Sequence, residues 1–113
     1  PTSGIIQAWL QCCLDTKDRA EAERAWSFMH EQDIIPTATC FERMARMHLM
    51  QEQYEEAFTL LEQTKQCALV PTRRMYAAMI WTCWQHNDER WRDLMQEMQE
   101  ARYEPGERLR ALS

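Results

Sequence analysis

The chain has 113 residues, of which 45% are hydrophobic and 27% charged, so it is long enough for one compact domain and too apolar for disorder. Two glycines and four prolines are too few for the many tight turns of a β-rich fold, and the abundant helix formers predict an all-α protein. A formal net charge of −5 argues against a protein that coats nucleic acid by bulk attraction, but it allows a basic strip on one face.

The first expected helix carries an apolar stripe at positions i, i+3, i+4 and i+7, the spacing of an amphipathic helix. The stripe consists of Ile6, Trp9, Leu10 and Cys13. A second helix is expected over about residues 18–32. Asp18 at its start suits the positive end of the helix dipole, and the proline that follows in Ile34-Ile35-Pro36-Thr37 stops it.

The same pattern returns 35 residues later. Phe41, Met44, Ala45 and His48 take the stripe positions of a third helix. A fourth helix is expected over about residues 53–67, and it is closed by Leu69-Val70-Pro71-Thr72. Since Pro36 and Pro71 stand in the same local sequence, the two segments predict one repeated unit.

A third copy follows. Tyr76, Met79, Ile80 and Cys83 form its first stripe, and a second helix is expected over about residues 88–102. Pro105 stands 34 residues after Pro71, so this copy is one residue shorter, and we expect the missing residue between its helices or early in the second one.

These copies predict three repeats over residues 3–37, 38–72 and 73–107, followed by a tail over residues 108–113 that would suit an irregular cap. One helical hairpin cannot bury its apolar stripe alone, whereas stacked hairpins bury a continuous core. We therefore expect an α-solenoid of stacked antiparallel helical hairpins. The start at Pro-Thr-Ser leads us to expect a mature form or a segment of a longer array.

The repeat resembles the pentatricopeptide repeat. The resemblance covers nearly the whole chain and is best in the second unit, from Thr39-Cys40-Phe41 through Tyr54-Glu55-Glu56-Ala57-Phe58 to Leu69-Val70-Pro71. The competing tetratricopeptide repeat has a step of 34 and a Leu-Gly signature that the first helices lack. One departure from the pentatricopeptide pattern is that Asp33, Ala68 and Arg102 replace the usual glycine three residues before each closing proline.

The resemblance implies an organellar protein, mitochondrial or plastid, that binds single-stranded RNA in a groove lined by the first helices. It also implies that the fifth and last residues of each unit read one base. The corresponding pairs are Gln7 with Thr37, Glu42 with Thr72, and Ala77 with Gly106. These pairs do not match the familiar base-reading combinations, which weakens the case for sequence-specific reading.

Helical spacing places six residues on the groove faces of the second and third first helices: Thr39, Glu42, Arg46, Arg74, Ala77 and Trp81. Arginines there could hold phosphates, and Trp81 could stack on a base. In the alternative interpretation, Glu42 and Arg46 form an i, i+4 ion pair on a solvated face, and Trp81 packs against a neighbouring subunit.

Catalysis has little support in the sequence. The three histidines stand in different units, no Gly-rich phosphate loop exists, and His48 on the apolar stripe is expected to be half-buried and hydrogen bonded. Five cysteines without a Cys-x-x-Cys pair predict small core residues in a reducing compartment, not disulfides or a metal site. We expect no enzyme, cofactor, metal or small-molecule substrate.

Two functions remain open. One is an RNA-associated repeat segment acting in RNA processing, stability or translation. The other is a protein–protein scaffold within a larger ribonucleoprotein, favoured by the acidic balance and by the many Trp and Met residues, which are enriched at interfaces. No apolar run approaches the roughly 20 residues that span a bilayer, and no targeting segment is visible. We therefore expect no membrane partner.

Overall fold

The computed structural model describes residues 2–112, and these residues form seven α-helices without a β-strand. The prediction of an all-α protein is therefore confirmed. The chain divides into two compact units, the first ending at Pro71 and the second beginning at Thr72.

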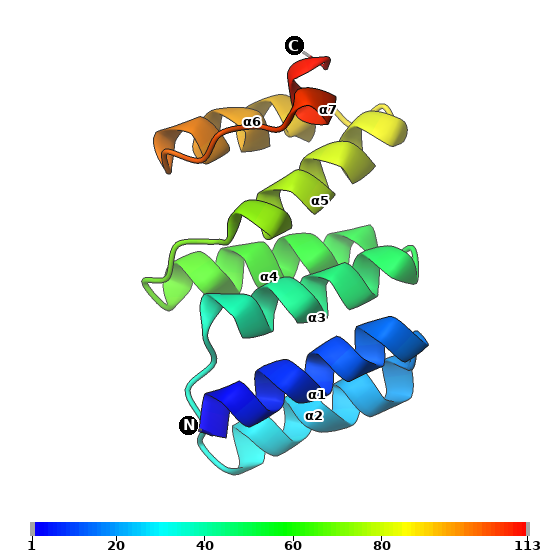
Figure 1. Ribbon diagram of the computed structural model, residues 1–113, viewed down its shortest axis with the longest axis vertical. Coiled ribbons are helices and arrows are strands. Elements are labelled where there is room, and N and C mark those ends of the chain that lie inside the picture. The colour runs from blue at the N-terminus through cyan, green and yellow to red at the C-terminus, as the bar shows by residue number, and fades with distance from the viewer. Residues whose placement is uncertain (1, 113) are drawn as a thin grey trace. The chain divides into compact units, whose positions relative to one another are not determined.

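The first unit contains four helices: α1 (Thr2–Thr16), α2 (Arg19–Glu31), α3 (Ala38–Met50) and α4 (Tyr54–Gln66). Helix α1 packs on both α2 and α3, α3 packs on α4, and α2 makes a smaller contact with α3. Helices α1 and α3 run side by side in the same direction, and each is followed by a helix that returns antiparallel to it (Figure 1). Two helical hairpins of the same design thus form this unit.

The second unit contains α5 (Arg73–Gln85), α6 (Arg90–Glu100) and a short helix α7 (Glu107–Arg110). Helix α5 packs on α6 and also on α7 (Figure 1). Residues expected to form a polar tail therefore begin with a helical turn, whose Leu109 is buried.

The positions that correspond in the repeat are buried to the same degree in each hairpin. Ile6, Phe41 and Tyr76 have 0–3% of their surface exposed. Leu10, Ala45 and Ile80 are equally buried, as are Met29, Thr64 and Met98. Thr64 is accommodated among apolar neighbours because its hydroxyl donates to the Leu60 carbonyl at 2.7 Å. The apolar stripes read from the sequence are therefore the buried faces of the helices.

Three of the helices start with a side-chain cap. The carboxylate of Asp18 accepts a hydrogen bond from the backbone N–H of Glu21. The hydroxyls of Thr37 and Thr72 accept from the N–H groups of Cys40 and Met75. Each cap satisfies a donor that the first helical turn leaves unpaired.

Helices α1 to α6 all end in the same way. The residue after each helix, or one position beyond, has a left-handed backbone with φ between 53° and 66°. These residues are Lys17, Asp33, Glu52, Ala68, Asn87 and Arg102. Lys17, Glu52 and Asn87 lie between the two helices of their hairpins, and each is 35 residues from the next. Asp33, Ala68 and Arg102 end the hairpins, with a spacing of 35 residues and then of 34. The missing residue of the third copy therefore lies between Asn87 and Arg102, where α6 has 11 residues and α2 and α4 have 13.

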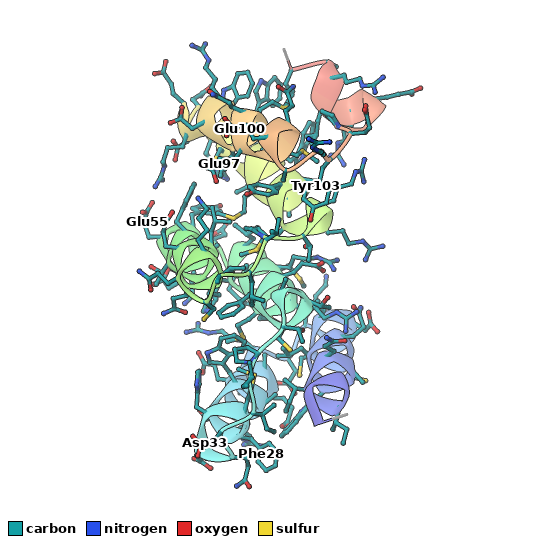
Figure 2. The ribbon with its side chains drawn as sticks, turned by 90° about the vertical axis from the view of Figure 1, so that its left-hand side faces the viewer. Phe28, Asp33, Glu55, Glu97, Glu100 and Tyr103 are labelled. Atoms are coloured by element: carbon teal, nitrogen blue, oxygen red, sulfur yellow. The ribbon has the colours of Figure 1, made fainter. Side chains whose placement is uncertain are left out.

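A fixed hydrogen-bond pattern holds each of these ends. The N–H groups of Ile34, Leu69 and Tyr103 donate to the carbonyls five residues earlier at 2.9–3.1 Å, the wider bond of a Schellman motif. At the three hairpin ends the residue that makes this bond is apolar or aromatic and half-buried. Tyr103, for example, lies beside Glu97 and Glu100 at the end of α6 (Figure 2), and its ring centroid is 6.2 Å from that of Tyr76. The turn and the apolar contact together fix where each hairpin ends.

Candidate binding groove

Gln7 and Thr37, a pair expected to act together, meet between α1 and the start of α3. The Gln7 side-chain amide donates to the Thr37 hydroxyl at 2.6 Å, and both residues are half-buried. The same hydroxyl accepts from the Cys40 N–H and lies 3.4 Å from the Cys40 Sγ. Thr37 is therefore mainly a structural residue, a role that was not predicted.

Arg43 joins this cluster from α3. Its guanidinium Nη1 donates to the Gln7 carbonyl at 2.6 Å, across the contact between α1 and α3. Its Nε is buried and has no hydrogen-bond partner within residues 2–112. The cluster therefore places a cation, and one unused donor, beside the Gln7–Thr37 pair.

Glu42 and Arg46 form the expected i, i+4 ion pair, with Arg46 Nη1 3.4 Å from Glu42 Oε2. The face is not solvated as that interpretation supposed, since only 7% of the Glu42 side chain is exposed against 32% for Arg46. Burying a carboxylate is costly unless a cation accompanies it, so Arg46 is committed to a structural role. Thr39, on the first turn of α3, is half-buried.

The pairing expected between Glu42 and Thr72 is not tested, because Glu42 belongs to the first unit and Thr72 to the second. Thr72 is the N-cap of α5 and is half-buried there. Arg74, two residues later, is exposed on the first turn of α5. Thus both of the threonines that close the repeats serve as helix caps.

Ala77 and Trp81 lie together on α5, at a hollow between α5 and α7. The hollow has a volume of about 280 Å³, and Arg73, Ala77, Trp81, Arg108 and Leu109 are among its lining residues. Arg73 Nε donates to the Glu104 carbonyl at 2.8 Å. Gly106, the third closing residue, is also at this hollow, where a Cβ would lie 3.4 Å from an Arg73 nitrogen.

Two aromatic rings and a guanidinium stack beside this hollow. The Arg108 guanidinium carbon lies 3.7 Å from the Trp81 ring centroid, close enough for a cation–π contact. The Trp81 and Trp84 rings are 5.6 Å apart with 20° between their planes. Trp81 is therefore half-buried within its own unit, whereas Trp84 is exposed.

The position of Arg108 was missed in the sequence, although a signal for it exists. Residues 39, 74 and 108 follow the repeat steps of 35 and 34, so Arg108 corresponds to Thr39 and Arg74. Carrying the register into the expected tail would have placed it on a groove face.

The other residues with chemical potential have structural environments. The His48 Nδ1 accepts from the Gln53 side-chain amide at 2.8 Å, and the oxygen of that amide accepts from Arg19, which confirms the expected half-buried, hydrogen-bonded histidine. Cys13, Cys40 and Cys83 are buried as expected, but Cys12 and Cys67 are exposed. Burial, followed by the nearby Glu21 and Asp18 carboxylates, raises the pKa of the Cys13 thiol, which keeps it protonated.

Over residues 2–112, no group of three or more His, Cys, Asp or Glu side chains is placed to hold a metal ion. In the same range, none of the helices combines the length and the apolar character that crossing a bilayer requires.

No model of a known protein family matches the chain, and no curated protein is significantly similar to it in sequence. Any assignment of the chain must therefore come from its own residues and their geometry.

Proposed function

We propose that the chain is a pentatricopeptide-type α-solenoid segment, without catalytic activity, that binds single-stranded RNA as part of an organellar ribonucleoprotein. The solenoid part is supported by the common register of the buried stripes and of the left-handed helix ends. The organellar location follows from the family resemblance alone.

The observation that carries the RNA-binding part is the contact between Gln7 and Thr37 at 2.6 Å. These residues are 30 positions apart, and the resemblance assigns this pair of positions to one base. The Gln7 amide can offer its oxygen to a base edge, while Arg43 beside it supplies positive charge in an acidic chain. A half-buried polar pair next to a cation suits a base and its phosphate.

The hollow between α5 and α7 supports the same function in the second unit. Two arginines and an indole ring surround it, and bases stack on both indole rings and guanidinium planes. Exposed Arg74 on the first turn of α5 adds a further cation for the phosphate backbone.

The test is fluorescence anisotropy of the chain with labelled single-stranded RNA over a series of salt concentrations. The variant is Arg74→Glu with Arg108→Glu, and the control is Arg24→Glu on α2, because Arg24 is also exposed but lies on a second helix. The double variant should flatten the salt dependence by about 1.4 logarithmic units, about 0.7 for each lost phosphate contact. The control should leave affinity and slope within about twofold of the parent chain.

Two results would overturn this proposal. One is the absence of RNA binding at low salt by a chain that is shown to be folded by circular dichroism. The other is an equal loss of affinity in the Arg74/Arg108 variant and in the Arg24 control, which would indicate only bulk attraction.

A second candidate function, a protein-binding scaffold, is favoured by the commitment of the groove side chains to one another. Glu42 and Arg46, both expected on the groove face, form an ion pair with each other. Trp84 and Phe28 remain exposed. This candidate gains if RNA binding fails while the fold is intact.

A further inference from the structure

One face of α1 is uncovered in the first unit. It is formed by Ile5, Ala8, Trp9 and Cys12, which we call the α1 seam. These residues follow the i, i+3, i+4, i+7 spacing of a single helix face. Ile5 is 65% exposed, Ala8 and Cys12 are exposed, and Trp9 is half-buried. An apolar stripe of this length on a helix normally packs against something.

The corresponding face of α3 shows what covers such a stripe. A step of 35 residues places Cys40, Arg43, Met44 and Met47 at the same positions as the α1 seam. Cys40, Met44 and Met47 are 0–3% exposed. Arg43 on this face donates to the Gln7 carbonyl, so the face turns toward α1. In the second hairpin, therefore, this stripe is buried against the first helix of the preceding hairpin.

We infer that the α1 seam is an interface for a further helix. This helix packs on α1 in the same way as α1 packs on α3. That helix belongs to another helical hairpin of the same 35-residue kind. This inference rests on the helical-repeat part of the proposed function and is independent of RNA binding.

The seam also defines the chemistry of its occupant. Ala8 corresponds to Arg43 of α3. The hydrogen bond from Arg43 to the Gln7 carbonyl therefore has no counterpart at the α1 seam. The occupant needs an uncharged apolar stripe. The Trp9 indole N–H already donates to Glu21 Oε1 at 3.2 Å, which leaves its ring face for apolar contact. The small Ala8 side chain leaves room for an aliphatic residue opposite it.

A shallow hollow beside the seam accepts one larger side chain. It has a volume of about 480 Å³ and is lined by Trp9 and by residues of α2, among them Phe28 and the charged Glu23, Arg24 and Glu31. The ring centroids of Trp9 and Phe28 are 5.9 Å apart. Phe28 lies at the outer edge of the first unit (Figure 2) and is 41% exposed. An occupant with an aromatic or long aliphatic residue at this point would cover both rings.

The test adds a copy of residues 2–36 directly before residue 2 of the full chain. The inserted length equals one repeat, so the register continues, and the added copy has serine in place of its own Cys12. The readout is the rate at which a thiol reagent modifies the original Cys12, compared with Cys67. Cys67 is also exposed but follows α4, so it serves as the internal reference.

We expect Cys12 to react at least about tenfold more slowly in the extended chain, which corresponds to docking by about 1.4 kcal/mol, while Cys67 is unchanged. Ile5→Glu in the original copy should restore the fast reaction of Cys12. The matched control Ile35→Glu, at an exposed loop position away from the seam, should not.

Equal rates for Cys12 with and without the added hairpin would overturn the inference, as would protection that survives Ile5→Glu. If sedimentation shows the unmodified chain to be a dimer in which Cys12 is already protected, the occupant is a second copy and the inference is wrong. RNA is absent throughout, so each of these results leaves the RNA proposal standing.

Discussion

Ala68 ends α4 with φ of 60°, in the left-handed region that glycine adopts without strain. In this conformation the Cβ of an L-residue crowds the following carbonyl oxygen, at a cost of about 1–2 kcal/mol. Glycine removes that cost but loses more chain entropy on folding, about 0.4–1 kcal/mol. Ala68→Gly should therefore raise the free energy of unfolding of the first unit by about 1 kcal/mol.

The measurement is urea and thermal denaturation followed by far-ultraviolet circular dichroism. For a unit of this size, about 1 kcal/mol corresponds to a rise in Tm of about 4–8 °C. The matched control is Ala8→Gly in the interior of α1, where the same substitution should lower stability by about 1 kcal/mol because glycine disfavours a helix. If Ala68→Gly destabilises the chain as much as Ala8→Gly does, the left-handed backbone conformation of Ala68 is wrong.

Two further predictions concern single contacts. Gln7→Ala and Thr37→Ala should each lower the free energy of unfolding. Because the two side chains share a hydrogen bond, a double-mutant cycle should give a coupling energy of about 1 kcal/mol. Additive effects of the two substitutions would contradict the contact. Burial, and then the Glu97 carboxylate that accepts the Tyr76 hydroxyl, raises the pKa of Tyr76 to about 12. Because the unfolded chain loses this proton near pH 10, the free energy of unfolding should fall as the pH rises from about 10 to about 12. Tyr76→Phe should remove part of that fall in denaturation curves measured across this range, and an unchanged pH dependence would count against the raised pKa.

The helices and their buried faces could be predicted because both depend on short-range patterns. The apolar stripe spacing of α1, α3 and α5 is set by the helical period, and the prolines mark where each hairpin closes. The expected second helices differ from α2, α4 and α6 only by one or two residues at each end. Helix ends fray and are the least determined part of such a pattern.

The roles of individual groove residues could not be predicted, because they depend on contacts between helices. Glu42 is expected either to face the groove or to lie on a solvated face, yet it is buried with Arg46 as its partner. Thr37 was assigned to a binding position, and its hydroxyl is occupied by a helix cap and by Gln7. The helical period predicts which face of a helix each of these residues occupies. It does not predict which other helix packs on that face.

The short helix α7 was missed for a different reason. Its four residues are too few to display a period, and glycine takes the closing position where threonine stands in the two earlier copies. Its burial comes from packing on α5, through Leu109. Extending the register of the repeat, instead of searching for a stripe, would have located it.

The shared design of the hairpin ends bears on how such a chain can change its length. Asp33 and Ala68 have the same backbone conformation, and each is followed by two branched aliphatic residues, a proline and a threonine that caps the next helix. If the sequence that ends at Asp33 were joined to the sequence that follows Ala68, the backbone conformation at the joint would be unchanged. On the backbone conformation of the turn alone, a hairpin inserted or removed between two such joints leaves each remaining turn as it was.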